Sequence, residues 1–308
     1  MQTRTYGDLF KITSALIGTG GELDVSEQDQ VSHFINRRFQ QAFDESPVWP
    51  RYLVPSEKRS LYSLNVVNSA TSTVNGNYEI LGQDTSGYNV YQLVDSTSVH
   101  VFRDGTTWKI KTASTASLAG SGTYSVSGGV TRHEEQDTEK KDNPYDVIVW
   151  SNNNSGAFSV TNTSLIPFTE TNKNAIGDFN RIHRKQAFMN NSSLEYEFFV
   201  DFNGANILNI ANSTDISAFV SYKKQFIPFT VTTDYYNSVV EVPGEFFNYI
   251  AHSVYADFLR VQNRQEQALA EEQVAQTYLA LELEKIDIRS NNNTINKRFS
   301  TYVNRQSR

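Results

Sequence analysis

The residues that could bind a metal are few, and their spacing does not suit a metal site. The chain has no cysteine, which excludes thiolate ligands, disulfides and cysteine nucleophiles together. Zinc sites commonly use histidines in close pairs such as HxxxH or HxH, and no such pair occurs here. We therefore expect no metal site. The histidines considered are His33, His100, His133, His183 and His252.

Motifs that would support catalysis or nucleotide binding are also missing. The sequence contains no GxSxG and no GxxxxGK[ST], and the run Gly18–Gly21 follows a helical pattern without the P-loop lysine. Asp201 and Asp215 could be imagined as a glycosidase carboxylate pair, but separation along the chain says nothing about distance in space. We expect no catalytic residue, no cofactor and no enzymatic activity. A cell-wall hydrolase is the alternative, which a peptidoglycan hydrolysis assay would detect.

Composition narrows the remaining classes. The chain has 308 residues and a net charge of -7, so it does not have the charge of a protein that coats nucleic acid. A chain facing DNA that must slide past it would also be acidic, so the sign of the charge is informative only together with other evidence. The first residues, Met1–Arg4, contain no apolar signal run, and no segment has the length and hydropathy of a membrane span.

Long amphipathic helices near the C-terminus are the elements around which the chain is organised. Phe246, Ile250, Val254 and Phe258 recur at a spacing of four and form one apolar face, and a polar elbow follows near Asn263. No Pro or Gly interrupts the segment from Glu245 to Ser290, so helix is expected throughout it. After the elbow, we expect the apolar face to resume with Leu269, Val274, Tyr278, Leu281 and Ile286.

A second pair of helices is expected at the N-terminus, over residues 5–17 and 26–46. The glycines after Ile17 stop the first helix, Ser26 can cap the second, and prolines end it. One-sided helices at both ends of the chain can bury their apolar faces against each other in a four-helix layer. The predicted helical core is Val31, Phe34, Phe39, Phe246, Ile250, Val254 and Phe258.

The middle of the chain changes to a spacing of two, which is typical of strands. Asp104–Gly105 is a tight-turn signal between two apolar runs and predicts a hairpin. We therefore predict an α+β fold in which helices from both ends form a layer and strands fill the middle. The expected divisions are an adaptor core of residues 1–60 plus 143–290 (helices 5–17, 26–46 and 243–287, β region 145–225), an inserted all-β module at 61–142, and a C-terminal arm at 291–308.

Three details of the β middle can be tested. Residues 133–143 are a run of acids and bases, interpreted as a solvated loop, and Val147–Trp150 is expected to be a buried strand. Four aromatic rings could form an exposed surface that stacks on glycans, or they could fill a β core, which we favour. The rings are Tyr78, Tyr88, Tyr91 and Trp108.

Charge reverses sharply at the end of the long helical segment. Residues 245–287 are rich in acids, whereas 288–308 contain bases and no acid. We expect Asn291–Asn293 to break the helix. The tail after the break is then either a disordered end, a nucleic-acid-binding arm, or an arm that orders on an acidic partner through aromatic anchors and basic contacts.

Three motifs in order resemble a known family. They are Asp201–Gly204 (DFNG), Val242–Phe246 (VPxxF) and Tyr255–Arg260, the last followed by a Gln/Ala/Glu-rich helix. This order is similar to that of the head-to-tail adaptors of short-tailed bacteriophages, also called tail tubular protein A or head-completion proteins. The similarity covers roughly residues 1–55 and 175–290.

The resemblance implies a structural virion protein in the phage neck, assembled in the host bacterial cytoplasm. It would form a ring, most often a dodecamer, between the portal and the tail tube or nozzle, and DNA would pass through its lumen during ejection. Tail fibres are further possible neighbours of the insertion. The alternative is a receptor- or glycan-binding tail module that uses the inserted β domain. Within the adaptor reading, the portal-binding residues are expected to be Arg289, Lys297, Arg298, Phe299, Tyr302, Arg305 and Arg308.

Overall fold

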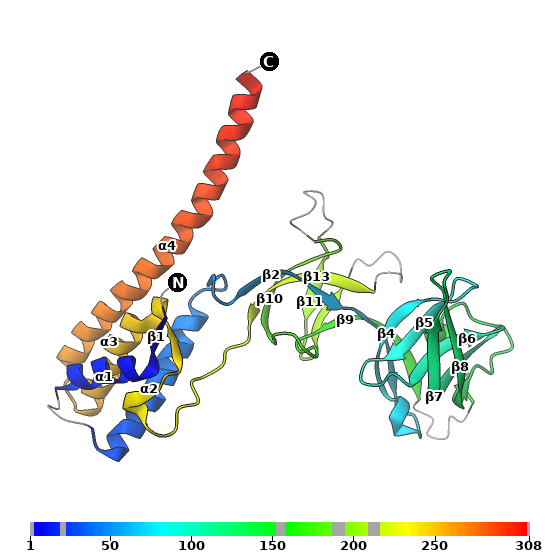
Figure 1. Cartoon of the computed structure of the whole chain (residues 1–308), viewed down its shortest axis with the longest axis horizontal. Helices are drawn as coiled ribbons and strands as arrows, with labels where there is room; N and C mark the ends of the chain where they lie inside the picture. Colours follow the sequence, from blue (N-terminus) through cyan, green and yellow to red (C-terminus); the bar gives the residue numbers. More distant parts are fainter. Residues whose placement is uncertain (1–2, 19–22, 152–157, 187–194, 209–215, 307–308) are drawn as a thin grey trace. The chain divides into compact units, whose positions relative to one another are not determined.

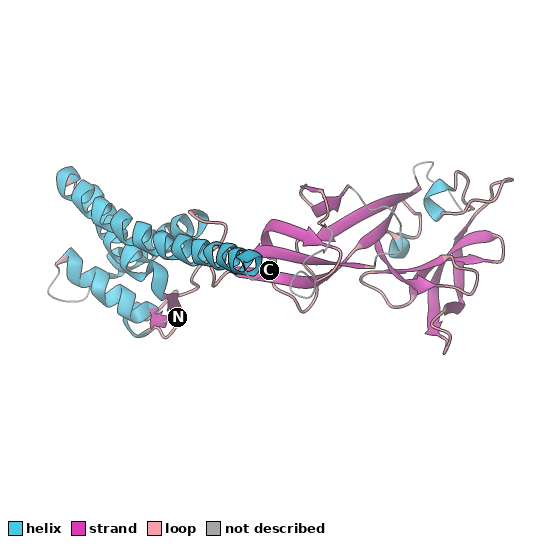
Figure 2. Ribbon diagram, turned by 90° about the horizontal axis from the view of Figure 1, so that it is seen from above, coloured by secondary structure: helices cyan, strands magenta, loops and turns pink. Residues whose placement is uncertain are grey.

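The protein is α+β and divides into two compact units, shown as a computed structural model in Figure 1. The helical unit joins Met1–Leu53 with Phe226–Arg308, and the β unit is Val54–Gln225. Figure 2 shows the long helices gathered in the first unit and most of the strands in the second. For Thr3 and residues 287–306 only the backbone is described. The described residues are 3–18, 23–151, 158–186, 195–208 and 216–306.

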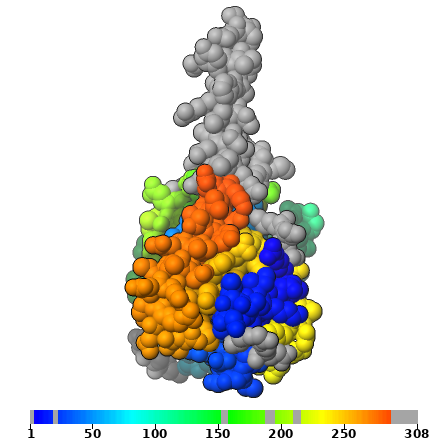
Figure 3. Space-filling model, turned by 90° about the vertical axis from the view of Figure 1, so that its left-hand side faces the viewer, coloured from blue at the N-terminus to red at the C-terminus, as the bar shows by residue number. Residues whose placement is uncertain are grey.

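The helical unit is built from the two ends of the chain. Strand β1 (Thr3–Thr5) pairs antiparallel with β14 (Glu241–Pro243), which ties the N-terminal segment to the segment that leads into α3. Figure 3 shows one face of this unit, with the described part of α4 in orange and α1 in dark blue. The helices are α1 (Tyr6–Ile17), α2 (Val25–Asp44), α3 (Gly244–Val261) and α4 (Gln265–Gln306), with a short 3-10 helix at Tyr235–Asn237.

The start of α2 differs from the sequence prediction. Asp24, rather than Ser26, is the N-cap: its carboxylate accepts from the Glu27 amide at 2.9 Å, and the Glu27 carboxylate accepts from the Asp24 amide at 3.3 Å. This reciprocal capping box satisfies two backbone donors at once, and the negative charges also suit a helix N-terminus. The predicted stop of α1 is confirmed, because Gly18 adopts the left-handed conformation at φ 82°.

The polar elbow between α3 and α4 is confirmed. Asn263 lies at φ 61°, and the amide of Arg264 donates to the carbonyl of Leu259 at 2.9 Å. The predicted helix break at Asn291–Asn293 is wrong, because α4 continues to Gln306. An asparagine inside a helix lowers helix stability by less than about 1 kcal/mol relative to alanine. No Pro or Gly follows that would force the helix to end.

One buried cluster holds the four helices together. Six of the seven predicted helical-core residues belong to it, whereas Phe34 is half-buried at its edge. Trp49 follows α2 and packs edge-on against Phe246 at 4.7 Å between ring centroids, and Phe39 lies 5.8 Å from the same ring. The six are Val31, Phe39, Phe246, Ile250, Val254 and Phe258.

The β unit contains two sheets within the described residues. The larger sheet is antiparallel throughout, and its spatial order is β11 (Phe198–Val200), β12 (Gly204–Ile207), β9 (Ser159–Pro167), β3 (Tyr62–Val67), β4 (Gly76–Gln83), β5 (Asn89–Leu93), β6 (Val99–Asp104), β7 (Thr107–Leu118) and β8 (Tyr124–Glu134). The smaller sheet has the order β10 (Ile176–His183), β13 (Ser217–Lys224) and β2 (Leu53–Ser60). Short 3-10 helices span Ser72–Val74 and Pro144–Asp146.

Strand pairing places the unit boundaries elsewhere than the sequence suggested. Strand β3, at the start of the expected insertion, pairs with β9, which lies beyond its expected end; Tyr62 faces Leu165 and Val66 faces Val160. Residues 61–142 therefore share one sheet with the segment that follows them. The break in contacts falls instead at residues 53/54 and 225/226. The predicted hairpin at Asp104–Gly105 is confirmed by the β6–β7 ladder.

Candidate functional site

A buried ionic cluster joins α2 to the α3–α4 hairpin. The Nε and Nη2 atoms of Arg38 donate to Asp257 at 2.7 and 2.6 Å, and its Nη1 and Nη2 donate to Glu272 at 2.9 and 2.8 Å. Arg38 is 6% exposed and Asp257 is 2% exposed. Arg37 and Arg260 also donate to Asp257, at 2.5 and 2.8 Å. Four donors therefore converge on one carboxylate.

The charges of this cluster compensate one another. Burial by itself raises the pKa of Asp257, but the hydrogen bonds and charges of Arg38 and Arg37 outweigh it and hold that pKa below its ordinary value. Burial opposes the charge of Arg38 in the same way, and Asp257 and Glu272 raise its pKa nevertheless. Both groups stay charged at neutral pH. Their hydrogen bonds are made within the protein, so the cluster ties α2 to α3 and α4.

Sequence reasoning missed this cluster, although a signal was present. Arg38 falls in the apolar stripe of α2 between Ile35 and Ala42, and Asp257 falls in that of α3 beside Val254. Charges of opposite sign inside two apolar stripes indicate a buried pair. A cleft of about 400 Å³ opens beside Arg38. It is lined by Arg38, Gln41, Asp44, Glu45, Tyr249, Gln276 and Leu279.

The outward side of α4 carries a row of apolar residues. Val274, Tyr278 and Leu281, here called the α4 stripe, are 40%, 37% and 49% exposed. Tyr278 stacks on His252 of α3 at 5.3 Å, and Nδ1 of that histidine lies 2.9 Å from a carboxylate oxygen of Glu271. The stripe forms an accessible surface along the helix.

The predicted inward face of α4 is therefore wrong for four residues. Leu269, Val274, Tyr278 and Leu281 are exposed, and only Ile286 packs partly against the core. The residues that α4 buries, two alanines and a leucine, lie on a different side of the helix from the predicted face. The small alanine side chains let α3 and α4 approach closely. The buried residues are Ala268, Ala275 and Leu279.

The predicted portal-binding side chains lie outside the described residues. The backbone from 287 to 306 is helical and continues α4, and Arg308 falls beyond the described chain. The tail that the sequence presented as a separate arm is thus the last part of one helix of 42 residues. This applies to Arg289, Lys297, Arg298, Phe299, Tyr302, Arg305 and Arg308.

The aromatic rings considered for glycan stacking fill the β core instead. Tyr78, Tyr91 and Trp108 are between 0 and 2% exposed. Tyr88 is half-buried, and the guanidinium of Arg103 lies 3.9 Å from its ring centroid. Three of the four rings are inaccessible to a sugar, so the favoured core interpretation is confirmed for them.

The expected solvated loop at 133–143 is wrong for its first residues. His133 is 1% exposed, stacks on Phe158 at 4.1 Å, and has a pKa lowered by burial. Glu135 is also buried, and its carboxylate accepts from the amides of Trp108 and Lys141 at 3.0 and 2.9 Å. The Glu135 carboxylate thus accepts hydrogen bonds from backbone amides, and charge patterning alone does not reveal this role.

The expected buried strand at Val147–Trp150 is also wrong. The carboxylate of Asp137 accepts from the amides of Ile148 and Val149, each at 2.8 Å. These amides are thereby satisfied without a strand partner, and both side chains point to solvent, at 79% and 51% exposure. Val147 and Trp150, at the two ends of this group, are buried in the core cluster of the β unit.

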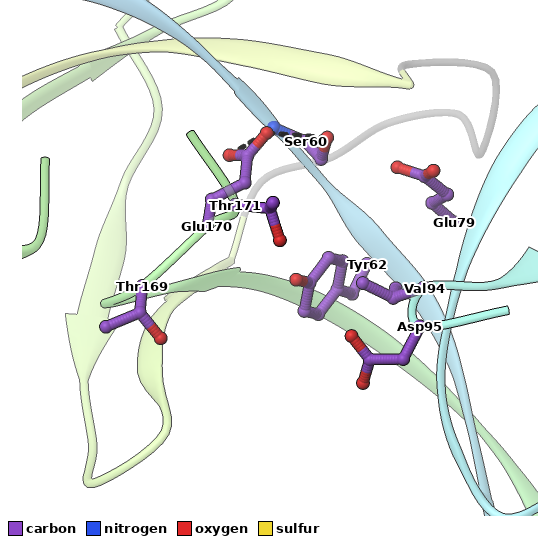
Figure 4. Close-up of a pocket in the computed structure, with 8 residues that line it drawn as sticks. All are labelled: Ser60, Tyr62, Glu79, Val94, Asp95, Thr169, Glu170 and Thr171. Carbon is purple, nitrogen blue, oxygen red and sulfur yellow. Dashed lines mark hydrogen bonds between the residues drawn. The ribbon is translucent and has the colours of Figure 1, made fainter. Parts of the chain in front are cut away.

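A cleft of about 480 Å³ in the β unit is lined by carboxylates and hydroxyls (Figure 4). Ser60 donates to Glu170 through its amide and its hydroxyl, at 3.2 and 3.1 Å. Burial, followed by the nearby charges of Glu170, Asp95 and Glu79, raises the pKa of Tyr62 to about 12. The cleft is acidic, but no group of three or more potential metal ligands occurs among the described residues.

The DFNG segment is a tight turn between β11 and β12. Asp201 accepts from the amide of Asn203 at 2.8 Å and from Asn206 Nδ2 at 2.9 Å, and Phe202 at the tip is 90% exposed. Gly204 has φ 150° and lies so close to β9 that a Cβ would be 2.1 Å from the carbonyl oxygen of Ile166. Asp215, the imagined second member of a carboxylate pair, lies outside the described residues.

Comparison of the chain with known proteins found no relative. No family model matches the chain, and neither the curated proteins nor the solved structures contain a significant match. Among the described residues, no helix is both long and apolar enough to span a membrane. The described surfaces that remain as candidates are the α4 stripe, the acidic cleft and the exposed β11–β12 turn.

Proposed function

We propose that this protein is a structural virion subunit of a short-tailed bacteriophage. In this proposal it forms a ring that joins the portal to the tail tube or nozzle and surrounds part of the DNA passage. The observation that carries the proposal is α4, which packs on α3 in its first half and continues as helix to Gln306. The order of the DFNG and VPxxF motifs supports the choice of this family.

In this proposal the end of α4 packs on a partner molecule. Isolated helices are only marginally stable in water, so the last part of α4 gains stability by packing on another molecule. Residues 288–308 contain five bases, Arg289, Lys297, Arg298, Arg305 and Arg308, and no acid. Such a segment suits an acidic groove on a larger ring, where charged pairs add specificity and speed the encounter.

The rest of the chain suits the same role. The ionic cluster around Asp257 ties α2 to α3 and α4, which supports a stiff unit able to repeat side by side in a ring. The net charge of -7 favours release of DNA from a lumen over binding to it. Repetition around a ring would strengthen a weak single contact through effective concentration.

Loading onto purified portal rings, seen by electron microscopy, tests the proposal. We expect the full-length chain to add a ring of density to the portal, and deletion of residues 289–308 to abolish loading while the subunit stays folded. Arg305→Glu should weaken loading, whereas Arg264→Glu, at an exposed base in the α3–α4 turn, should leave it unchanged. Normal occupancy by the truncated chain would remove the end of α4 from the mechanism.

A further inference from the structure

Val274 and Leu281 of the α4 stripe are exposed, and their spacing identifies an occupant. We propose that the stripe of one copy receives the end of α4 from a second copy of this chain, in parallel and staggered by fourteen residues. Its place in a ring rests on the proposed function, whereas the contact itself requires only two copies. The occupant is residues 288–302 of the second copy, through Ile288, Ile295 and Tyr302; Arg289, Lys297 and Arg305 lie outside these positions and are left for the portal contact.

The stripe has the spacing of a helix–helix seam. Val274 and Leu281 are seven residues apart, and they lie roughly 130° around the helix from the side that α4 buries. In the sequence, Ile288, Ile295 and Tyr302 continue the same spacing of seven without interruption. Such residues supply one of the two seam positions in each heptad, and the other position here holds Thr277, Glu284, Asn291 and Arg298.

The occupant must come from another molecule. Because α4 is one continuous helix from Gln265 to Gln306, its end cannot fold back onto its own first half. The end of α4 in a second copy offers the apolar residues that such a seam requires. It also carries Arg298, whose charge is opposite to that of Glu284, an exposed residue beside the stripe.

Charge selects the stagger. In register, Glu284 of one copy would meet Glu284 of the next, which is repulsive. A shift of fourteen residues places Glu284 opposite Arg298 and Leu281 opposite Ile295. The same shift places Val274 opposite Ile288.

A staggered contact has consequences for assembly. It joins two different parts of the same helix, so each copy still offers one unused part to the next copy. Contacts of this head-to-tail kind close into a ring where the rotation between copies permits it, and otherwise extend as an open filament. The stripe thus supplies an inter-copy interface whose register is set by residues on one helix.

Disulfide trapping tests the contact directly, because the native chain has no cysteine. We expect the full-length double variant Leu281→Cys/Ile295→Cys, oxidised without portal, to form a ladder of covalent oligomers. The two positions are fourteen residues apart, about 21 Å along a helix, which is too far for a bond within one chain. The matched control is Leu269→Cys/Ile295→Cys, because Leu269 is 60% exposed on the same helix but outside the stripe.

The outcomes separate this inference from the proposed function. A ladder from the stripe variant and none from the control supports the staggered contact. Equal ladders from both variants, no ladder at any protein concentration, or efficient dimers from Leu281→Cys alone would overturn it. A ladder without portal loading would support the contact between copies and count against the adaptor role. Portal loading without a ladder would support the adaptor role and count against the contact.

Discussion

Replacing Asp257 with Asn removes the charge at the centre of the ionic cluster while keeping the side chain's shape. The Asp257 carboxylate accepts from Arg37, Arg38 and Arg260, and Arg38 is almost wholly buried. An amide offers one oxygen in place of two and points an NH₂ group at the remaining donors. Removing one member of a buried ion pair costs about 3–5 kcal/mol, and we expect the helical unit to lose that much stability.

Urea unfolding followed by far-ultraviolet circular dichroism measures the effect, because that signal reports mainly the helices α1–α4. The control is Glu282→Gln, which breaks the exposed pair with Lys285 and should cost at most about 1 kcal/mol. A loss of unfolding free energy below about 1 kcal/mol for Asp257→Asn would refute the interpretation that the ionic cluster stabilises the helical unit.

The pH dependence gives a second check on the same variant. The folded-state pKa of Asp257 is lowered from 3.8, so its charge contributes stability above that ordinary value and loses it as pH falls through the folded pKa. The stability gap between the native chain and Asp257→Asn should be constant above about pH 5 and should narrow under strongly acidic conditions. A gap that narrowed near neutral pH would assign the effect to another group.

Two further predictions concern the β unit. Gly204→Ala forces a Cβ against the Ile166 carbonyl at a φ of 150°, so it should destabilise the β unit by about 1–3 kcal/mol. Urea unfolding followed by tryptophan fluorescence measures this loss. The control Gly120→Ala has no atom near its Cβ and should be neutral, and equal effects of the two substitutions would contradict the clash. Replacing residues 54–225 with a Gly/Ser linker should leave a cooperatively folding helical unit, because residue contacts separate the chain into two units at these boundaries. Loss of helix in the product would mean that the two units depend on each other.

The amino-acid sequence was enough to predict the fold class and most of the helical core. Phe246, Ile250, Val254 and Phe258 could be recognised because a spacing of four defines one side of a helix before any partner is known. The Asp104–Gly105 hairpin could be recognised because its turn depends on local backbone preferences.

Features that depend on distant partners were decided only by the tertiary structure. Arg38 and Asp257 are 219 residues apart, and Glu135 and Asp137 are buried because they bind backbone amides that lie elsewhere in the chain. The phase of α4 was misjudged because alanines, which carry little hydropathy signal, let α3 approach closely and leave Val274 and Leu281 exposed. Periodicity shows that a helix has an apolar side, but the shape of its neighbour decides which side it buries.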